Sequence, residues 1–368
     1  GRFMSDKTGM APIRDAAASG VLSIDAMGGD LGPEAVISGL ALAVKKIPAI
    51  RFIVHGDKPT LDALIAKRRG LSDHCTVRHA DDIVAMTDKP SQVLRTGRDT
   101  SMWSAVEAVK SGEATVCVSC GNTGALMAVS TIRLRKLPGV NRPAIAILWP
   151  SRNPSGFNVM LDVGADIRAD AEDLVQYALM GMSYARNGLG LDRPRVGLLN
   201  VGTEENKGRT ELKDAHDRIE KVAVDNGFDF VGFVEGGDIP GDRVDVIVTD
   251  GFTGNVALKT GEGTARFVRD MLAEAFRATP LSKVAALLAM SSLKRLSRRI
   301  DPRRVNGGVF LGLNGTVVKS HGSADETGIA AAVGLAWNLS EAGFSERLKA
   351  RVAAATATLE QTAPEAET

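Results

Sequence analysis

The chain has 368 residues, of which 44% are hydrophobic and 24% are charged, a composition typical of a globular protein with room for one large α/β domain or two. A formal net charge of +1 and an aromatic content of only 4% argue against a nucleic-acid-binding protein. Three cysteines, an odd and low count, favour a reducing compartment over a disulfide framework. No run of about 18 apolar residues is present, so we expect no membrane span.

Apolar runs alternate with helical patterns over most of the chain. The runs predict strands at 21–25, 51–55, 76–80, 116–119, 144–149, 157–161, 195–201, 228–234, 244–249, 309–313 and 316–319. The segments between them predict helices at 33–46, 59–69, 90–110, 125–134, 171–186, 210–224, 255–276 and from 325 onward. This alternation predicts a three-layer α/β/α, Rossmann-like fold with a mostly parallel sheet. The turn at 151–156 adds an antiparallel hairpin.

The chain is expected to form one α/β domain over residues 21–346, because no Pro/Gly/Ser-rich linker divides it. Residues 1–20 are interpreted as a tag or disordered leader, and residues 347–368 as the end of a C-terminal helix and a disordered tail.

Four predicted strands end in the same kind of turn, at 25–30, 119–124, 200–208 and 249–255. Each turn combines glycine with Asn, Asp, Thr or Glu. Ligands of open parallel sheets bind outside the carboxyl ends of the strands, so we expect the four turns to line one cleft. A helix that begins at such a turn presents free N–H groups and its positive dipole end to an anion, above all phosphate. The alternative is ordinary turn chemistry and helix capping, which is less able to explain all four turns together.

The residue types suggest separate roles. Glycines let the backbone approach a ligand, amides and hydroxyls offer hydrogen bonds, and Lys207 is the natural cation for a phosphate. Lys89 and Arg95 either add positive charge or are plain surface residues. Carboxylates at strand ends orient a nucleophile, hold a metal or cap helices, and a lone histidine such as His321 is more often structural than catalytic. The candidates for phosphate or substrate binding are Gly28, Gly29, Asp30, Lys89, Arg95, Gly121, Asn122, Thr123, Gly124, Asp162, Asn200, Gly202, Thr203, Glu204, Glu205, Gly251, Thr253 and Gly254.

Several familiar motifs are absent or incomplete. Cys117 and Cys120 have redox spacing, but Cys117 lies inside a predicted strand, which favours buried thiols that only pack. There is no second Cys pair for zinc, no P-loop and no nucleophile elbow, and the glycines after the first strand lack the full dinucleotide fingerprint. No cofactor is therefore expected.

Residues 279–304 form a basic amphipathic helical insertion with seven positive charges and one negative charge. Such a segment is typical of a membrane-surface helix or a dock for an acidic partner. The alternative is a surface helix pair packed on the core or on a second subunit. The residues expected to contact membrane or partner are Leu287, Leu288, Lys294, Arg295, Arg298 and Arg299.

The turns, taken together, resemble those of a known family. The segments Asp25–Asp30, Cys120–Ala125, Asn141–Pro143, Leu161–Gly164, Asn200–Gly208 and Asp250–Asn255, in this order, are similar to the motifs of the phosphate acyltransferase (PlsX) family. One departure is Asp166, where the family usually has Asn, and a carboxylate there would repel phosphate unless it were paired.

The resemblance implies transfer of a fatty acyl group from acyl carrier protein to inorganic phosphate, giving acyl phosphate for bacterial phospholipid synthesis. It implies a fold like the isocitrate/isopropylmalate dehydrogenases and phosphotransacetylases. It also implies a cytoplasmic homodimer, peripherally associated with the inner face of the cell membrane, that supplies a glycerol-3-phosphate acyltransferase which uses acyl phosphate.

The resemblance also orders the catalytic candidates. The turns at 122–124 and 253–255, with Lys207 and Asn255, are expected to bind phosphate and the developing oxyanion. Asp250 or Asp25, or else His321, is expected to transfer the phosphate proton as an acid–base group.

Three rival functions remain from the sequence. They are a phosphotransacetylase acting on short acyl-CoA, a metal- and nicotinamide-dependent decarboxylating dehydrogenase of similar fold, and a catalytically silent membrane-bound scaffold. The sequence also leaves open the acyl chain length, the general base, and whether 279–304 meets lipid, carrier protein or the other subunit.

Overall fold

The computed structural model describes residues 20–165, 168–300 and 307–362, and eleven strands in this part of the chain form one sheet. The expected leader up to residue 19, the tail from 363, and the departure at Asp166 lie outside the described residues. The strands are β1 (Val21–Asp25), β2 (Arg51–Gly56), β3 (Cys75–His79), β4 (Val116–Ser119), β5 (Ala144–Pro150), β6 (Phe157–Leu161), β7 (Arg195–Leu199), β8 (Asp229–Val234), β9 (Val246–Val248), β10 (Gly308–Leu311) and β11 (Thr316–Lys319).

The sheet order is β3-β2-β1-β4-β11-β10-β5-β6-β9-β7-β8, and seven of the ten neighbouring pairs are parallel. The mostly parallel sheet and the antiparallel β5–β6 hairpin are as predicted. The sequence did not predict that β10 is antiparallel to both of its neighbours. Three successive antiparallel pairs, β11–β10, β10–β5 and β5–β6, therefore separate the first strand group (β3, β2, β1, β4, β11) from the second strand group (β6, β9, β7, β8), and the two groups run in opposite directions.

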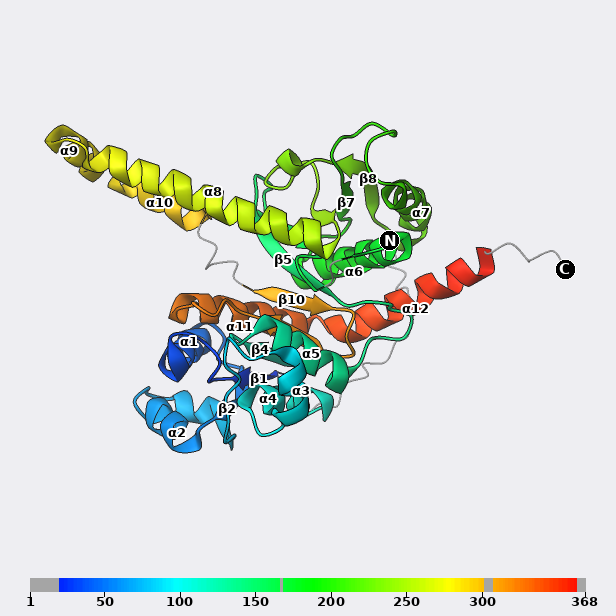
Figure 1. Ribbon diagram of the computed structural model, residues 1–368. Coiled ribbons are helices and arrows are strands. Elements are labelled where there is room, and N and C mark those ends of the chain that lie inside the picture. The colour runs from blue at the N-terminus through cyan, green and yellow to red at the C-terminus, as the bar shows by residue number, and fades with distance from the viewer. Residues whose placement is uncertain (1–19, 166–167, 301–306, 363–368) are drawn as a thin grey trace, which may run out of the picture.

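Helices cover both faces of the sheet (Figure 1). They are α1 (Gly32–Lys46), α2 (Lys58–Ala66), α3 (Pro90–Thr96), α4 (Ser101–Lys110), α5 (Thr123–Leu134), α6 (Ala171–Leu189), α7 (Thr210–Asn226), α8 (Gly251–Arg277), α9 (Pro280–Leu288), α10 (Met290–Ile300), α11 (Glu326–Glu341) and α12 (Phe344–Thr362), with short 3₁₀ turns at Leu71–His74 and Gly236–Asp238. One apolar core lies under α1, α6, α7, α11 and α12, and a second lies under α4, α5 and the start of α8. Burial of both sheet faces explains why the strands are continuous apolar runs.

One helical prediction needs correction. The single helix expected over 90–110 is two helices, because α3 ends at Gly97 and a new N-cap follows, where the Thr100 hydroxyl accepts the Trp103 N–H at 3.2 Å. The helical region expected from 325 consists of two helices, α11 and α12. Buried Leu348 and Val352 attach the first part of α12 to the core.

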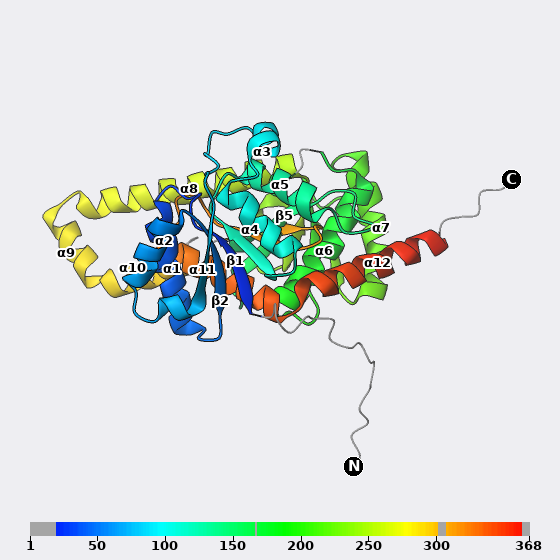
Figure 2. The same cartoon turned by 90° about the horizontal axis from the view of Figure 1, so that it is seen from below.

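Helices α8, α9 and α10 form an arm that projects from the body of the molecule (Figures 1 and 2). Only Gly251 and Gly254 of α8 are buried, and α9 and α10 have no buried residue. Within the described residues, no helix has both the length and the apolar character needed to cross a membrane. The arm is therefore an exposed surface held at one end, by the first turns of α8.

Candidate active site

Asp25, the last residue of β1, is buried at the carboxyl end of the first strand group. Its carboxylate oxygens accept hydrogen bonds from the hydroxyls of Ser101 and Ser119, each at 2.7 Å, and one of them also accepts the Met27 N–H at 3.3 Å. Burial raises the pKa of Asp25, and these hydrogen bonds oppose the rise. The carboxylate is thus fixed beneath the turn that follows β1.

The glycines of this turn bring neighbouring loops into close contact. A Cβ atom on Gly28 would lie 2.8 Å from the Cα of Gly121, and one on Gly29 would lie 3.6 Å from the Gly322 carbonyl oxygen. Asp30 is exposed, and its N–H donates to that same carbonyl at 2.8 Å. The loops after β1, β4 and β11 therefore form one cluster, in which only glycine fits at position 28.

Asn122 caps α5, and its side chain is occupied by the protein itself. Its Oδ1 accepts the Ala125 N–H at 3.1 Å, and its Nδ2 donates to three carbonyls of an earlier loop, the nearest being that of Asp88 at 2.8 Å. Thr123 and Gly124, the first two residues of α5, are exposed. The backbone N–H groups of this first turn, rather than the Asn122 amide, are the groups placed to meet an anion.

The turn after β11 joins the first strand group to α8. His321 Nε2 lies 3.9 Å from Glu262 Oε1 of α8, and the two side chains are 61% and 40% exposed. Lys319, the residue that ends β11, is partly buried in the same cluster and was not among the sequence candidates. The signal that could have identified it is a charged residue at the end of an otherwise apolar strand, directly before Ser-His-Gly.

Asp162 and Asp250 follow β6 and β9 of the second strand group, and both stabilise the turns in which they lie. Asp162 is buried, and its Oδ1 accepts the N–H groups of Ile145 at 2.9 Å and Ala165 at 3.0 Å. Asp250 caps α8 by accepting the Thr253 N–H at 2.8 Å, and its other oxygen accepts from Arg209 at 2.6 Å. The Asp250–Arg209 pair places the 200–208 loop beside the start of α8.

Gly254 and Asn255 seat α8 on the turn after β6. A Cβ atom on Gly254 would lie 1.9 Å from the Asp162 carbonyl oxygen, so the helix backbone touches this turn directly. The Asn255 Nδ2 donates to the Val163 carbonyl at 3.3 Å. Gly251 is buried as well, and at position 254 the first turn of α8 packs too closely to accept a larger residue.

The 200–208 loop is anchored by Asn200, whose Oδ1 accepts the Val201 N–H at 2.8 Å and whose Nδ2 donates to the Lys207 carbonyl at 3.0 Å. Gly202 is buried, whereas the remaining candidate residues of the loop are exposed: Thr203, Glu204, Glu205 and Lys207. The loop is thus fixed by its backbone and leaves the Lys207 ammonium in solvent.

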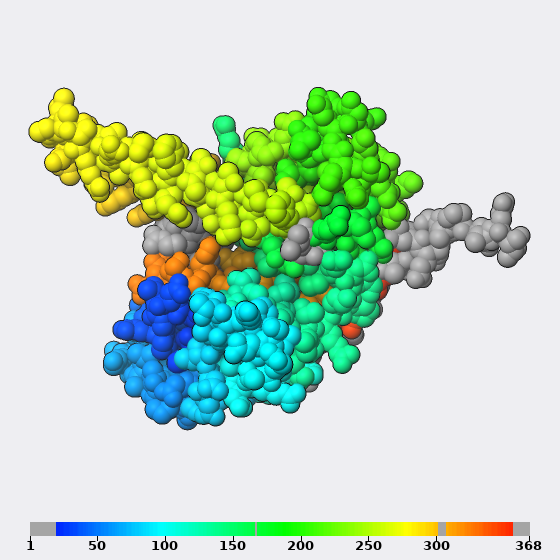
Figure 3. Space-filling view, viewed as in Figure 1, coloured from blue at the N-terminus to red at the C-terminus, as the bar shows by residue number. Residues whose placement is uncertain are grey.

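The two sets of turns face the same side of the molecule. Helices α3 and α5 and the start of α8 lie together at the front of Figure 1 and at the top of Figure 2. Figure 3 shows the surface hollowed between the start of α8 and the teal and orange segments below it, and we refer to this hollow as the central cleft. Opposed strand groups can share one cleft because each strand of a sheet is rotated by roughly 20–25° from the last, and five steps separate β4 from β9.

Other sequence candidates lie at the edge of this arrangement or away from it. Lys89 and Arg95 are exposed at the start and in the last turn of α3. Cys117 and Cys120 are buried, and burial raises the pKa of both thiols, that of Cys120 to about 11. The arm residues Leu287, Leu288, Lys294, Arg295, Arg298 and Arg299 are on α9 and α10, and the two leucines are 70% and 83% exposed.

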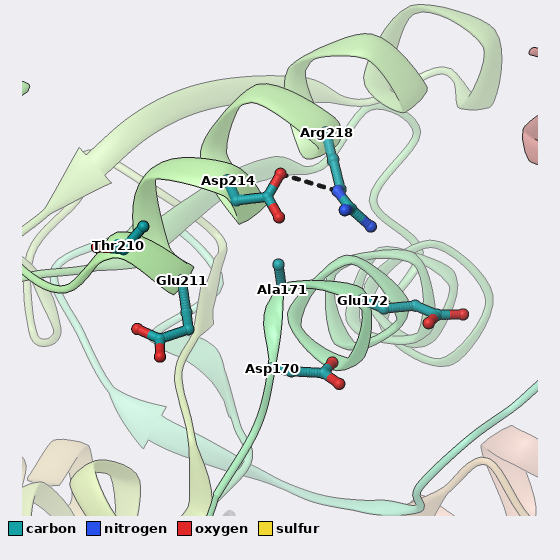
Figure 4. A pocket seen from close by; sticks show the side chains of 7 residues that line it. All are labelled: Asp170, Ala171, Glu172, Thr210, Glu211, Asp214 and Arg218. Carbon is teal, nitrogen blue, oxygen red and sulfur yellow. Dashed lines mark hydrogen bonds and ion pairs between the residues drawn. The ribbon is translucent and has the colours of Figure 1, made fainter. Parts of the chain in front are cut away.

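A separate depression of about 340 Å³ lies between the starts of α6 and α7 (Figure 4). Its charged lining consists of four carboxylates, those of Asp170, Glu172, Glu211 and Asp214, and one guanidinium, that of Arg218. Arg218 is paired with Asp214 at 2.9 Å. This excess of negative charge would repel phosphate, which leaves the central cleft as the candidate active site.

Solved structures of similar shape define the class of fold. The chain superposes on a phosphotransacetylase from Streptococcus pyogenes with a TM-score of 0.59 and 17% identity, covering 89% of this chain and 96% of the other. For the EutD phosphotransacetylase from Staphylococcus aureus the TM-score is 0.56 at 13% identity, with the same coverage. The fold is therefore a mixed α/β fold of the phosphotransacetylase type.

Sequence comparison identifies the family. The family model described as "Fatty acid synthesis protein" matches residues 21–347. Proteins named phosphate acyltransferase are 72% identical in Jannaschia sp. (strain CCS1), over 96% of each chain, and 65% identical in Ruegeria pomeroyi, again over 96% of each. The chain belongs to the phosphate acyltransferase family, which confirms the family and the enzyme class expected from its turns.

Proposed function

We propose that this chain transfers a fatty acyl group from acyl carrier protein to inorganic phosphate, forming acyl phosphate for phospholipid synthesis. Family membership supports acyl transfer to phosphate. The structural observation that supports the proposal is the central cleft, which lies between the start of α8 and the segments below it (Figure 3) and so places a helix N-terminus and glycine-bearing turns beside one hollow. The overall architecture proposed is that of the isocitrate/isopropylmalate dehydrogenases, of which the phosphotransacetylase fold is a relative.

The reaction needs no covalent enzyme intermediate, because phosphate is itself the nucleophile. A phosphate oxygen attacks the thioester carbonyl carbon, the carbonyl oxygen becomes an oxyanion, and the C–S bond then breaks. The carrier-protein thiolate leaves and takes up a proton. The enzyme must hold the two substrates together and supply donors where negative charge develops.

We assign the oxyanion and the transferred acyl group to the start of α8, with Asn255 and Lys207. This turn presents a helix N-terminus, and the Asp250–Arg209 pair holds the Lys207 loop beside it. His321 is the proposed group for proton transfer, because its side chain is exposed beside α8, whereas Asp25 and Asp250 are buried and their oxygens already accept hydrogen bonds.

The proposed partners follow from the arm and from the family. The exposed leucines of α9 and the basic residues of α10 are proposed to lie on the anionic inner face of the cell membrane, each basic residue contributing on the order of 1 kcal/mol. A cytoplasmic homodimer bound there would deliver acyl phosphate directly to the glycerol-3-phosphate acyltransferase that uses it.

The deciding experiment measures phosphate-dependent release of free thiol from acyl carrier protein and, in parallel, from short acyl-CoA. Preference for the carrier protein supports the proposal, preference for acyl-CoA indicates a phosphotransacetylase, and no release with either indicates a silent scaffold. Among folded variants, Lys207→Ala and Asn255→Ala should each lower kcat/KM by about 10²–10³-fold. Lys221→Ala, on the exposed side of α7, is the matched control and should keep full activity.

A further inference from the structure

Lys319 belongs to a row of polar side chains at the carboxyl ends of three neighbouring strands. Asp25 of β1 is in register with Ser119 of β4, and Ser119 is in register with Lys319 of β11. Residues in register across parallel strands point to the same face, so Lys319 and the fixed Asp25 carboxylate share one face of the sheet, with Ser119 between them. This row ends at the cleft side of the first strand group.

The Lys319 ammonium has no ion-pair partner in the described part of the chain. Its Nζ donates to the carbonyl of Ser320, and no carboxylate lies within 4.0 Å of it there. Both Asp25 oxygens instead accept from serine hydroxyls. Burial lowers the pKa of Lys319, and the nearby Cys120, Asp30 and Asp25 oppose that change. A single carbonyl partner does not fully offset the free-energy cost of removing a partly buried ammonium group from water.

The surroundings of Lys319 have the features of an anion site. The β1 turn approaches the β4 turn so closely that only glycine fits at position 28. Gly121 leads directly into the exposed first turn of α5, so helix N–H groups lie next to the row. The second strand group carries another cation, Lys207, on the exposed part of the 200–208 loop.

We propose that Lys319 binds the phosphate nucleophile through its ammonium group, and that this phosphate sits over the carboxyl ends of β1, β4 and β11. The inference rests on the proposed function. In this proposal the two strand groups bind different substrates: the first binds phosphate, and the second, with Lys207 and the start of α8, binds the thioester. Binding of phosphate supplies the missing counter-charge to Lys319.

The test compares Lys319→Met, Lys319→Arg and the control Lys221→Met in the full-length protein. Lys319→Met keeps the apolar stem and removes the charge, so it should unfold no earlier than wild type. It should raise the KM for phosphate at least tenfold while leaving the KM for the acyl donor within twofold, and Lys319→Arg should recover part of the affinity. An unchanged KM for phosphate in Lys319→Met would overturn the proposal and assign Lys319 to charge balance with Asp25 and Asp30.

A second measurement uses the unmodified protein, so that it does not depend on a variant folding. Lysines are labelled with an acetylating reagent and quantified by mass spectrometry, with and without inorganic phosphate. Phosphate should protect Lys319 and leave Lys221 unchanged, and no protection of Lys319 contradicts the proposal. Because labelling requires no turnover, a protein that shows protection but no thiol release would retain the phosphate site and refute only the proposed acyl transfer.

Discussion

The contact between Gly254 and the turn after β6 allows a direct test of whether this contact positions α8 at the cleft. In Gly254→Ala, the new methyl group would meet the Asp162 carbonyl oxygen at 1.9 Å, whereas Cβ atoms in proteins essentially never come within 3.0 Å of another atom. The obstacle is backbone, so it cannot rotate away, and α8 must move by about 1 Å or more. Overpacking of this kind costs about 1–3 kcal/mol, which lowers Tm by several degrees.

The displacement also moves the start of α8, which carries Asn255 at the cleft. A misplacement of about 1 Å can cost roughly 10²-fold in rate, so we expect kcat/KM for acyl-phosphate formation to fall by that order in Gly254→Ala. The matched control is Gly263→Ala on the same helix, where a Cβ atom meets nothing within 4 Å. This control should keep full activity and gain up to about 1 kcal/mol of stability from the better helix propensity of alanine.

The assay pairs thermal unfolding with phosphate-dependent thiol release for both variants. If Gly254→Ala matches wild type in Tm and in kcat/KM, then the contact with Asp162 does not position α8 and the geometric reasoning is wrong.

Three further predictions concern stability, thiol chemistry and the arm. His55 is buried, and its pKa is lowered from 6.5 to about 3, mainly by burial, so between these pH values the unfolded chain binds a proton that the folded protein does not. The free energy of unfolding should therefore fall as pH drops from 6.5 toward 3, by about 1.4 kcal/mol per pH unit. Urea unfolding at a series of pH values should show a weaker dependence of this free energy on pH in His55→Asn. Cys117 and Cys120 should resist iodoacetamide in the native protein at pH 8, with activity unchanged, and rapid labelling of either would contradict their burial. Leu287→Glu with Leu288→Glu should abolish cosedimentation with anionic liposomes while leaving thiol release in solution intact, and undiminished binding would count against the membrane role of the arm.

Local features were predictable because they depend on neighbouring residues. The strand Val21–Asp25 and the hairpin strand Phe157–Leu161 have the bounds that their apolar runs predicted. The helix expected over 90–110 was wrong because the periodicity continues across Gly97 and Thr100, and the cap at Thr100 competes successfully with helix continuation. Short-range patterns therefore located elements well and misjudged one break between them.

The candidate site was predictable as a set of residue types but not as a set of contacts. The sequence favoured the Asn122 side chain as a phosphate ligand, and the structure shows that amide tied to the loop that ends near Asp88. It passed over Lys319, whose interest depends on its register with Ser119 and Asp25 and on the absence of a nearby carboxylate among the described residues. The register and the absence of a nearby carboxylate depend on segments far apart in the chain, so the local pattern at Lys319 could not show them.

By itself, the sequence determined that four apolar strands end in glycine-bearing polar turns suited to an anion, because turn chemistry and helix capping are local. Only the tertiary structure decided that these turns face one cleft. Three successive antiparallel pairs, β11–β10, β10–β5 and β5–β6, set the two strand groups in opposite directions, which would place their carboxyl ends at opposite edges of a flat sheet. The twist accumulated across the intervening strands, and α8 seated by Gly254 on the turn after β6, bring the two sets of turns to the same side.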